Sequence, residues 1–218
     1  MERKIVSTIG SIGFIVFLVI FPHFVPLPFY SYAPFCLLAI YLMLRRERKS
    51  FRDIGLIKEK LTVNAFFLGA VTAVGWVAIM QFVYIPSIKY FFQVPDYTEY
   101  NFIKSSMIRL LMTILAALIV GGFYEEIVFR GYIQNVLEKR IFKRFSPLIS
   151  ILVTSLLFGF YHFQQDIFAI IAAVMGGLYW SILDKKFGNL WIPIVSHALF
   201  DTITLILIYK EAFGIMSY

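Results

Sequence analysis

The sequence predicts an all-α integral membrane protein, a multi-span helical bundle of about seven transmembrane helices. Hydrophobic residues make up 60% of the 218-residue chain, whereas a typical soluble domain holds roughly 45–50%. Charged residues reach only 15%, against about 25% in soluble domains. This composition leaves too little polar surface to cover a water-soluble fold, and it excludes a disordered chain or a disulfide scaffold.

Seven apolar runs account for the predicted helices. A membrane-spanning helix needs about 20 predominantly apolar residues. In chain order, the runs are Ile5–Phe21, Phe29–Leu44, Leu61–Pro86, Met107–Leu137, Pro147–Phe163, Ile167–Leu183 and Leu190–Tyr209. The first run follows a basic start, but no small-residue cleavage site comes after it, so we expect a retained helix rather than a signal peptide.

Basic residues between the runs predict the orientation in the membrane. With the N-terminus in the cytoplasm, four Lys and Arg residues fall on the external side: Lys89, Lys104, Arg109 and Lys210. Fifteen fall on the cytoplasmic side: Arg3, Lys4, Arg45, Arg46, Arg48, Lys49, Arg52, Lys58, Lys60, Lys139, Arg140, Lys143, Arg144, Lys185 and Lys186. Cytoplasmic loops carry the excess of Lys and Arg. We therefore expect a multi-pass protein with a cytoplasmic N-terminus, and the net charge of +7 needs no nucleic-acid partner to explain it.

Ionisable side chains lie inside three of the predicted spans, where each charge costs at least ~2.5–3.5 kcal/mol on insertion scales. They are Glu125, Glu126 and Arg130 in the fourth run, His162 in the fifth, and His197 and Asp201 in the seventh. At ~1.5 Å per helical residue, their depths from the cytoplasmic edge fall between roughly 16 and 27 Å. Three helices could therefore bring carboxylates and imidazoles into one buried layer.

Local spacing predicts which of these groups share a helix face. Glu126 and Arg130 are four residues apart, as are His197 and Asp201, so each pair lies on one face. Glu125 is rotated by about 100° from its neighbour and can point elsewhere.

Some neighbouring residues have ordinary structural interpretations. The glycine pairs at 121–122 and 176–177 permit close helix packing or a kink. We interpret Phe158 as a packing residue and Asp166 as an external loop residue. A single intramembrane histidine is usually a packing contact, so the set of residues carries the hypothesis rather than any one member.

Three motifs occur in order on these spans: E-E-x-x-x-R at 125–130, F-x-x-x-H at 158–162 and H-x-x-x-D at 197–201. Together they resemble the CPBP family of intramembrane proteases, which includes the type II CAAX prenyl endopeptidases and bacterial Abi proteins. The resemblance covers about Met107 to Tyr209. It implies that residues 101–218 form the catalytic transmembrane region and residues 1–100 form variable N-terminal transmembrane helices.

The resemblance implies a role for each motif residue. Glu125 is the candidate general base, with His162 orienting the attacking water, and Glu126 and Arg130 support the local structure. His197 and Asp201 would stabilise the oxyanion. An ionised carboxylate would repel an oxyanion, however, so Asp201 is either protonated by burial, or orients His197, or helps to bind a cation.

The cofactor is left open by the sequence. One alternative is a divalent metal such as zinc held by Glu125, His162 and His197 with a bound water, which is a common catalytic ligand set. The other is a metal-free mechanism in which the glutamate activates water. The chain lacks the H-E-x-x-H motif of soluble zinc proteases, and no other cofactor-binding residues are predicted.

The predicted function is hydrolysis of a peptide bond in a membrane-associated peptide or protein, by an intramembrane endopeptidase in a bacterial cell membrane. The partners are therefore this substrate and the lipid bilayer, with no nucleic acid. One alternative is a non-catalytic membrane binding or immunity protein of the same fold. A proton-coupled transporter is a second alternative, because carboxylates and histidines can form proton relays, although transporters usually show internal repeats that this chain lacks.

Overall fold

The computed structural model describes residues 2–24, 30–92, 98–143 and 147–212, with backbone only at 2–7 and 99. Arg144, one of the predicted cytoplasmic residues, lies outside these ranges. All regular elements in the described ranges are helical, which confirms the all-α prediction. The α-helices are α1 (Glu2–Phe24), α2 (Tyr32–Arg46), α3 (Val63–Ile79), α4 (Ile85–Phe91), α5 (Asn101–Lys104), α6 (Met107–Ala116), α7 (Gln134–Val136), α8 (Pro147–Tyr161), α9 (Ile167–Phe187) and α10 (Trp191–Tyr209).

Four helices are long and apolar enough to cross a membrane: Val63–Phe91, Met107–Ile141, Ile167–Phe187 and Trp191–Tyr209. The protein is therefore an integral membrane protein. Each of the seven predicted runs falls on a helix. However, α8 and the apolar part of α1 are shorter than these four helices. Helix α2 is also short, with 15 residues. At 1.5 Å per residue, α2 is about 22 Å long, less than the ~30 Å hydrocarbon core. The count of seven spans is not confirmed.

The long helix Met107–Ile141 departs from regular α-helical winding after Ala116. Residues Ala117–Glu125, Ile127–Ile133 and Leu137–Ile141 (η6, η7 and η8) wind as π-helix. Stretches of π-helix are rare and occur often at functional sites. The predicted motif E-E-x-x-x-R lies across the first two of them.

Local hydrogen bonds fix where two of the spanning helices begin and end. The Oδ1 atom of Asp166 accepts hydrogen bonds from the backbone N–H groups of Phe168 (2.7 Å) and Ala169 (2.9 Å). Asp166 therefore caps the N-terminus of α9. At the other end, Gly188 adopts φ 56°, the left-handed conformation that commonly terminates a helix. Like Asp166, Thr62 caps a helix N-terminus: its side-chain oxygen accepts a hydrogen bond from the N–H group of Ala65 in α3 at 3.1 Å.

The chain folds into two compact units. The first unit comprises Met1–Lys60 and Tyr124–Leu190, and the second comprises Leu61–Phe123 and Trp191–Tyr218. The helix Met107–Ile141 contributes its N-terminal half to the second unit and its C-terminal half to the first. The division at residue 100 that the family resemblance implies stays a prediction.

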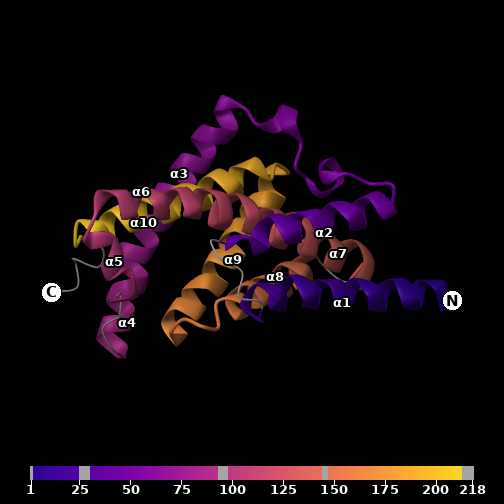
Figure 1. Ribbon diagram of the computed structural model, residues 1–218, viewed down its shortest axis with the longest axis horizontal. Helices are drawn as coiled ribbons and strands as arrows, with labels where there is room; N and C mark the ends of the chain where they lie inside the picture. The colour runs from indigo at the N-terminus through magenta and orange to yellow at the C-terminus, as the bar shows by residue number, and fades with distance from the viewer. Residues whose placement is uncertain (1, 25–29, 93–97, 144–146, 213–218) are drawn as a thin grey trace. The chain divides into compact units, whose positions relative to one another are not determined.

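In the first unit, α8 packs against α9, and α1 packs against α2 and α8 (Figure 1). Ion pairs join the polar ends of its helices: Arg140 to Glu47, and Lys185 to Glu138. Partial burial raises the pKa of Glu47, but hydrogen bonds and charges from Arg140 and Lys49 offset this effect and lower the pKa below its ordinary value. The pair is therefore charged at neutral pH.

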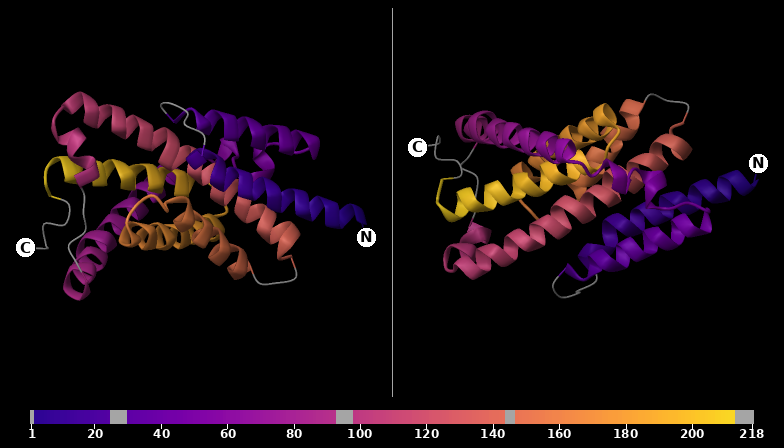
Figure 2. Two further views of the ribbon diagram at one scale, coloured as in Figure 1. Left: turned by 60° about the horizontal axis from the view of Figure 1, so that its bottom comes forward. Right: turned by 90° about the horizontal axis from the view of Figure 1, so that it is seen from above.

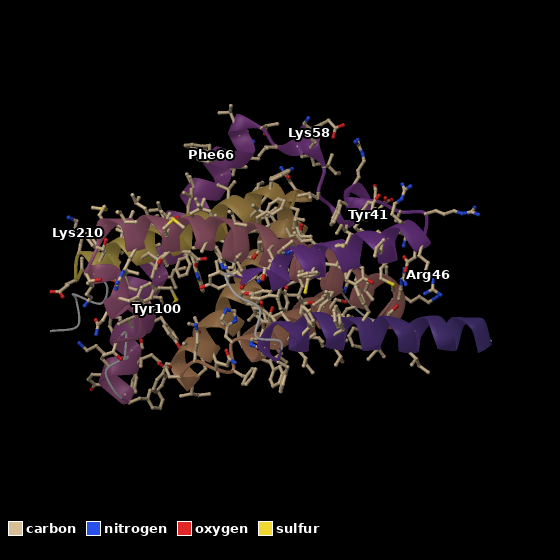
Figure 3. All side chains as sticks on the ribbon, in the orientation of Figure 1. Tyr41, Arg46, Lys58, Phe66, Tyr100 and Lys210 are labelled. Carbon is tan, nitrogen blue, oxygen red and sulfur yellow. The ribbon has the colours of Figure 1, made fainter. Side chains whose placement is uncertain are left out.

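In the second unit, α10 packs along α3 (Figure 2). A Cβ atom at Gly69 would lie 2.6 Å from Cβ of Val195, so glycine permits this close approach. At one end, a cluster of Ile103, Leu110, Leu205 and Ile208 is packed against Tyr100 and Tyr209. Tyr100 and Lys210 are labelled at this end in Figure 3.

Gly177→Ala is expected to lower the free energy of unfolding by about 1–3 kcal/mol, because a methyl group there overpacks the contact between α8 and α9. The added Cβ would lie 2.9 Å from Cα of Ser155, a backbone atom that cannot rotate away. Thermal unfolding in detergent micelles measures the change. Gly13→Ala is the control, because nothing lies within 4 Å of its added methyl group. Equal melting temperatures for the two variants would show that the α8–α9 contact accommodates the added methyl group, contrary to the prediction.

Candidate active site

A buried ion pair lies at the centre of the first unit. Arg130 Nη1 donates a hydrogen bond to Glu126 Oε1 at 2.9 Å, and both side chains have no exposed surface. The two residues are one turn apart on the same helix, as their spacing predicts. Arg130 Nη2 also donates to the backbone carbonyl of Gly177 on α9 at 3.3 Å. The pair therefore ties two helices together inside the bundle.

Two aromatic rings cover the Arg130 guanidinium. Its Cζ atom lies 4.4 Å from the ring centre of Phe158 on α8 and 5.5 Å from that of Trp180 on α9. Aromatic faces attract cations, most strongly where water is excluded. Asp184 on α9 also interacts electrostatically with Arg130. These contacts stabilise a charge that would otherwise be costly to bury.

His162 follows α8 and is oriented by the same residue that covers Arg130. Its Nδ1 atom lies 2.8 Å from the carbonyl oxygen of Phe158. When Nδ1 carries the proton of a neutral imidazole, it donates this hydrogen bond and Nε2 becomes the basic nitrogen. The sequence led us to expect only a packing role for Phe158. Its ring also contacts Arg130, and its carbonyl oxygen orients His162.

Glu125 is also buried in the first unit, with 7% of its surface exposed. Its carboxylate interacts electrostatically with the hydroxyl groups of three tyrosines, Tyr32, Tyr124 and Tyr161. Sequence reasoning missed these tyrosines. Tyr124 and Tyr161 directly precede motif residues, which was a usable signal, but nothing in the sequence links Tyr32 to them.

In the second unit, His197 and Asp201 lie on one face of α10, with His197 Nε2 3.6 Å from Asp201 Oδ2. His197 is 4% exposed. The glycines 121–122 allow the helix Met107–Ile141 to approach this face closely. A Cβ atom at Gly121 would collide with Asp201 Oδ2, and one at Gly122 would collide with Cβ of Ala198. Close helix packing, one of the two alternatives predicted for these glycines, is thus confirmed.

The predicted site residues are divided between the two units. The first unit holds Glu125, Glu126, Arg130 and His162, and the second holds His197 and Asp201. Their roles in catalysis, and the meeting of the two sets, stay predictions. Within the described part of either unit, no group of three or more His, Cys, Asp or Glu side chains is arranged to hold a metal ion. The predicted ligand set draws on both units.

Comparisons with known proteins agree with the resemblance deduced from the motifs. Residues 107–203 match the family model described as type II CAAX prenyl endopeptidase Rce1-like. This confirms the predicted resemblance over a segment that contains all six candidate residues. An uncharacterized 24.3 kDa protein of Escherichia coli is 29% identical over 106 residues, covering 48% of this chain and 48% of that protein. The chain thus spans about half the length of this relative. No solved structure matches the chain.

Proposed function

We propose that the protein is an intramembrane endopeptidase that hydrolyses a peptide bond in a membrane-associated peptide or protein. The observation that carries the proposal is the buried set of motif residues in the first unit, where Glu126 and Arg130 are fully buried and His162 is oriented by a backbone carbonyl. Intramembrane charges are costly and are usually retained for function. The same residues lie in the segment that matches an endopeptidase family.

Glu125 acts as the general base and His162 orients the water. The carboxylate takes a proton from water, and the water oxygen forms a bond to the carbonyl carbon of the substrate. The π electron pair moves to the carbonyl oxygen, which becomes an oxyanion. When this intermediate collapses, the C–N bond breaks and the proton held by Glu125 passes to the leaving amine. Glu126 and Arg130 hold the helix that presents the base.

His197 approaches the reacting carbonyl from α10 in the same layer of the membrane. The depths counted along the sequence support this placement. The 3.6 Å separation between its Nε2 atom and Asp201 favours one of the three roles considered for Asp201, the orientation of His197. A carboxylate in that role stabilises the protonated imidazole and fixes its ring.

A divalent metal such as zinc is compatible with the donor types of this set. The contact between His162 Nδ1 and a backbone carbonyl is typical of the second shell that orients metal-binding histidines. Glu125, His162 and His197 would hold the ion. When bound, such an ion lowers the pKa of a coordinated water and polarises a carbonyl. The chemistry assigned above to the chain's own residues does not depend on it.

We also propose that the N-terminus is cytoplasmic and that the membrane is that of a bacterial cell. The excess of Lys and Arg in the loops supports the orientation. The ion pairs Arg140–Glu47 and Lys185–Glu138 within one unit support the assignment of their segments to one side of the membrane. In the second unit, Lys104 and Glu211, from predicted external segments, form an ion pair at 3.3 Å. The similar protein of Escherichia coli supports the bacterial location.

Cleavage by purified protein in proteoliposomes tests the proposed function. Two internally quenched peptides serve as probes, a farnesylated peptide with a C-terminal CAAX sequence and a single transmembrane peptide. We expect the wild type to cleave at least one of them, and His162→Ala to lower kcat/KM about 100-fold or more. Phe160→Ala is the matched control, because Phe160 lies two residues before His162 at the end of α8 and is 56% exposed. Cleavage by His162→Ala at the wild-type rate would overturn the proposed role.

A further inference from the structure

A set of buried polar side chains in the first unit has no part in the proposed mechanism. Its four members come from three helices, and each is 0% exposed: Gln134, Ser150, Thr154 and Ser181. Among the residues that the structure describes, their hydroxyl groups have no hydrogen-bond partner. The same holds for both the amide nitrogen and the amide oxygen of Gln134. We call these four side chains the polar layer.

Contacts on either side of the polar layer place two of its members at one level. Two contacts join the helix Met107–Ile141 to α9 at points two turns apart on each helix: Arg130 Nη2 to the carbonyl of Gly177 at 3.3 Å, and Glu138 to Lys185. Gln134 lies midway between these contacts on the first helix, and Ser181 lies midway between them on α9. Residues four apart share a face of a helix. Gln134 and Ser181 therefore lie in the interface between the two helices.

Helix α8 brings the other two members to this level. It packs against η7, α7 and η8 (Figure 1), and the short connection that precedes it makes it their antiparallel neighbour. The ring centre of Phe158 lies 4.4 Å from Arg130 Cζ. Thr154 is one turn before Phe158, so it lies beside Gln134, which is one turn after Arg130. Ser150 lies one turn further toward the polar end of the first unit.

The chemistry of the polar layer suits bound water. Buried polar groups are costly without a partner, so in folded proteins they bind other groups of the protein or ordered water. A buried water makes about three hydrogen bonds. Each hydroxyl of the layer can donate one hydrogen bond and accept two, and the amide of Gln134 can donate two and accept two. Arg130 Nε, which has no acceptor within the described part of the chain, adds a donor one turn away. Its positive charge disfavours a cation at this place.

We propose that the polar layer binds a cluster of water molecules that links the polar end of the first unit, at the ion pair of Glu138 and Lys185, to the guanidinium of Arg130. The water gives the hydroxyls and the amide of the layer their partners, and it accepts the hydrogen bond of Arg130 Nε. The buried charge of Arg130 is thus hydrated from inside the protein, in addition to its pairing with Glu126. This inference goes beyond the proposed function and does not depend on it.

Thr154→Val tests the proposal through the sign of its effect on stability. Valine has nearly the shape of threonine but lacks the hydroxyl. If water binds the layer, the variant loses a hydrogen bond, and we expect the melting temperature in detergent micelles to fall by about 2–4 °C. If the layer is dry, the variant removes an unpaired buried hydroxyl, and the melting temperature rises. An unchanged or higher melting temperature would overturn the proposal.

Hydroxyl-radical labelling of the protein in lipid nanodiscs detects the water itself. X-ray pulses produce radicals from water, including water bound inside a protein, and the radicals oxidise adjacent side chains. Trp180 is the reporter, because it is 2% exposed and its ring centre lies 5.5 Å from Arg130 Cζ. We expect the double variant Gln134→Met/Thr154→Val to lower the oxidation of Trp180 at least about fivefold, since a buried water needs about three hydrogen bonds to stay bound.

Ser155→Ala is the matched control. Ser155 is also 0% exposed and lies in the same helix as Thr154, but its Oγ atom donates to the carbonyl of Ile151 at 2.7 Å and needs no water. This variant should leave the oxidation of Trp180 unchanged, and thermal melting should show that every variant folds. Equal oxidation of Trp180 in the wild type and the double variant would contradict the water cluster. Neither measurement uses peptide cleavage, so a failure of this inference is distinguishable from a failure of the proposed function.

Discussion

Arg130→Met is expected to lower the free energy of unfolding by about 3–5 kcal/mol, the cost of leaving one member of a buried ion pair without its partner. Both side chains of the Glu126–Arg130 pair are fully buried. Methionine keeps much of the side-chain length but removes the charge, so the Glu126 carboxylate would remain in an apolar interior. The contacts of the guanidinium with Phe158 and Trp180 would also be lost.

Equilibrium unfolding in mixed detergent micelles measures this loss. Arg109→Met is the matched control, because Arg109 lies in the same long helix but is exposed, and its side chain bonds locally, to Ser105 Oγ at 3.1 Å. We expect the control to change stability by no more than about 0.5 kcal/mol. Adding Glu126→Gln to Arg130→Met should recover part of the loss, because the uncompensated charge disappears. An Arg130→Met protein as stable as the control would refute the structural role of the pair.

Glu125→Gln is expected to lower kcat at least ~1000-fold, since an amide cannot accept the proton of the attacking water. Glutamine has nearly the same shape, so peptide binding should stay within about threefold of the wild type. Single-turnover cleavage and fluorescence anisotropy with the same peptide separate the two quantities. Binding without cleavage is the result that identifies Glu125 as the base.

The same variant separates the protease from a non-catalytic binding or immunity protein. A protein that only sequesters a peptide does not activate water, so Glu125→Gln would keep its full cellular function. Glu138→Gln controls for the loss of a carboxylate in the same helix, because Glu138 pairs with Lys185 at the polar end of the first unit. Full cellular function in both variants would favour the binding protein, whereas loss in Glu125→Gln alone supports the hydrolase.

Much of the fold was predictable because burial in lipid imposes one physical requirement on sequence. The backbone must satisfy its own hydrogen bonds there, so long apolar runs become helices. Each predicted run therefore lies on a helix, with ends shifted by a few residues, as at Ile167–Leu183 against Ile167–Phe187. The number of spans was less predictable. Helix α2 is mostly apolar up to Leu44 but has 15 residues and ends in two arginines, and hydropathy alone does not decide whether such a helix crosses the membrane.

The candidate site was predictable where it depends on local spacing. The pairing of Glu126 with Arg130 follows from their separation of four residues on one helix. Contacts between helices far apart in sequence left no such pattern. The double role of Phe158 depends on where α8 packs, and the electrostatic interaction of Tyr32 with Glu125 depends on where α2 packs. Asp166 illustrates a smaller gap: we expected a loop residue, and its carboxylate caps α9.

An experimental structure of the protein in lipid nanodiscs tests the central claim most directly, because it measures where the two units place their side chains. We expect the carboxylate of Glu125 and the imidazoles of His162 and His197 to surround one water molecule or one metal ion within hydrogen-bonding or coordination distance. Side chains of these three residues that face lipid, or that lie too far apart to share a ligand, would contradict the proposed hydrolase.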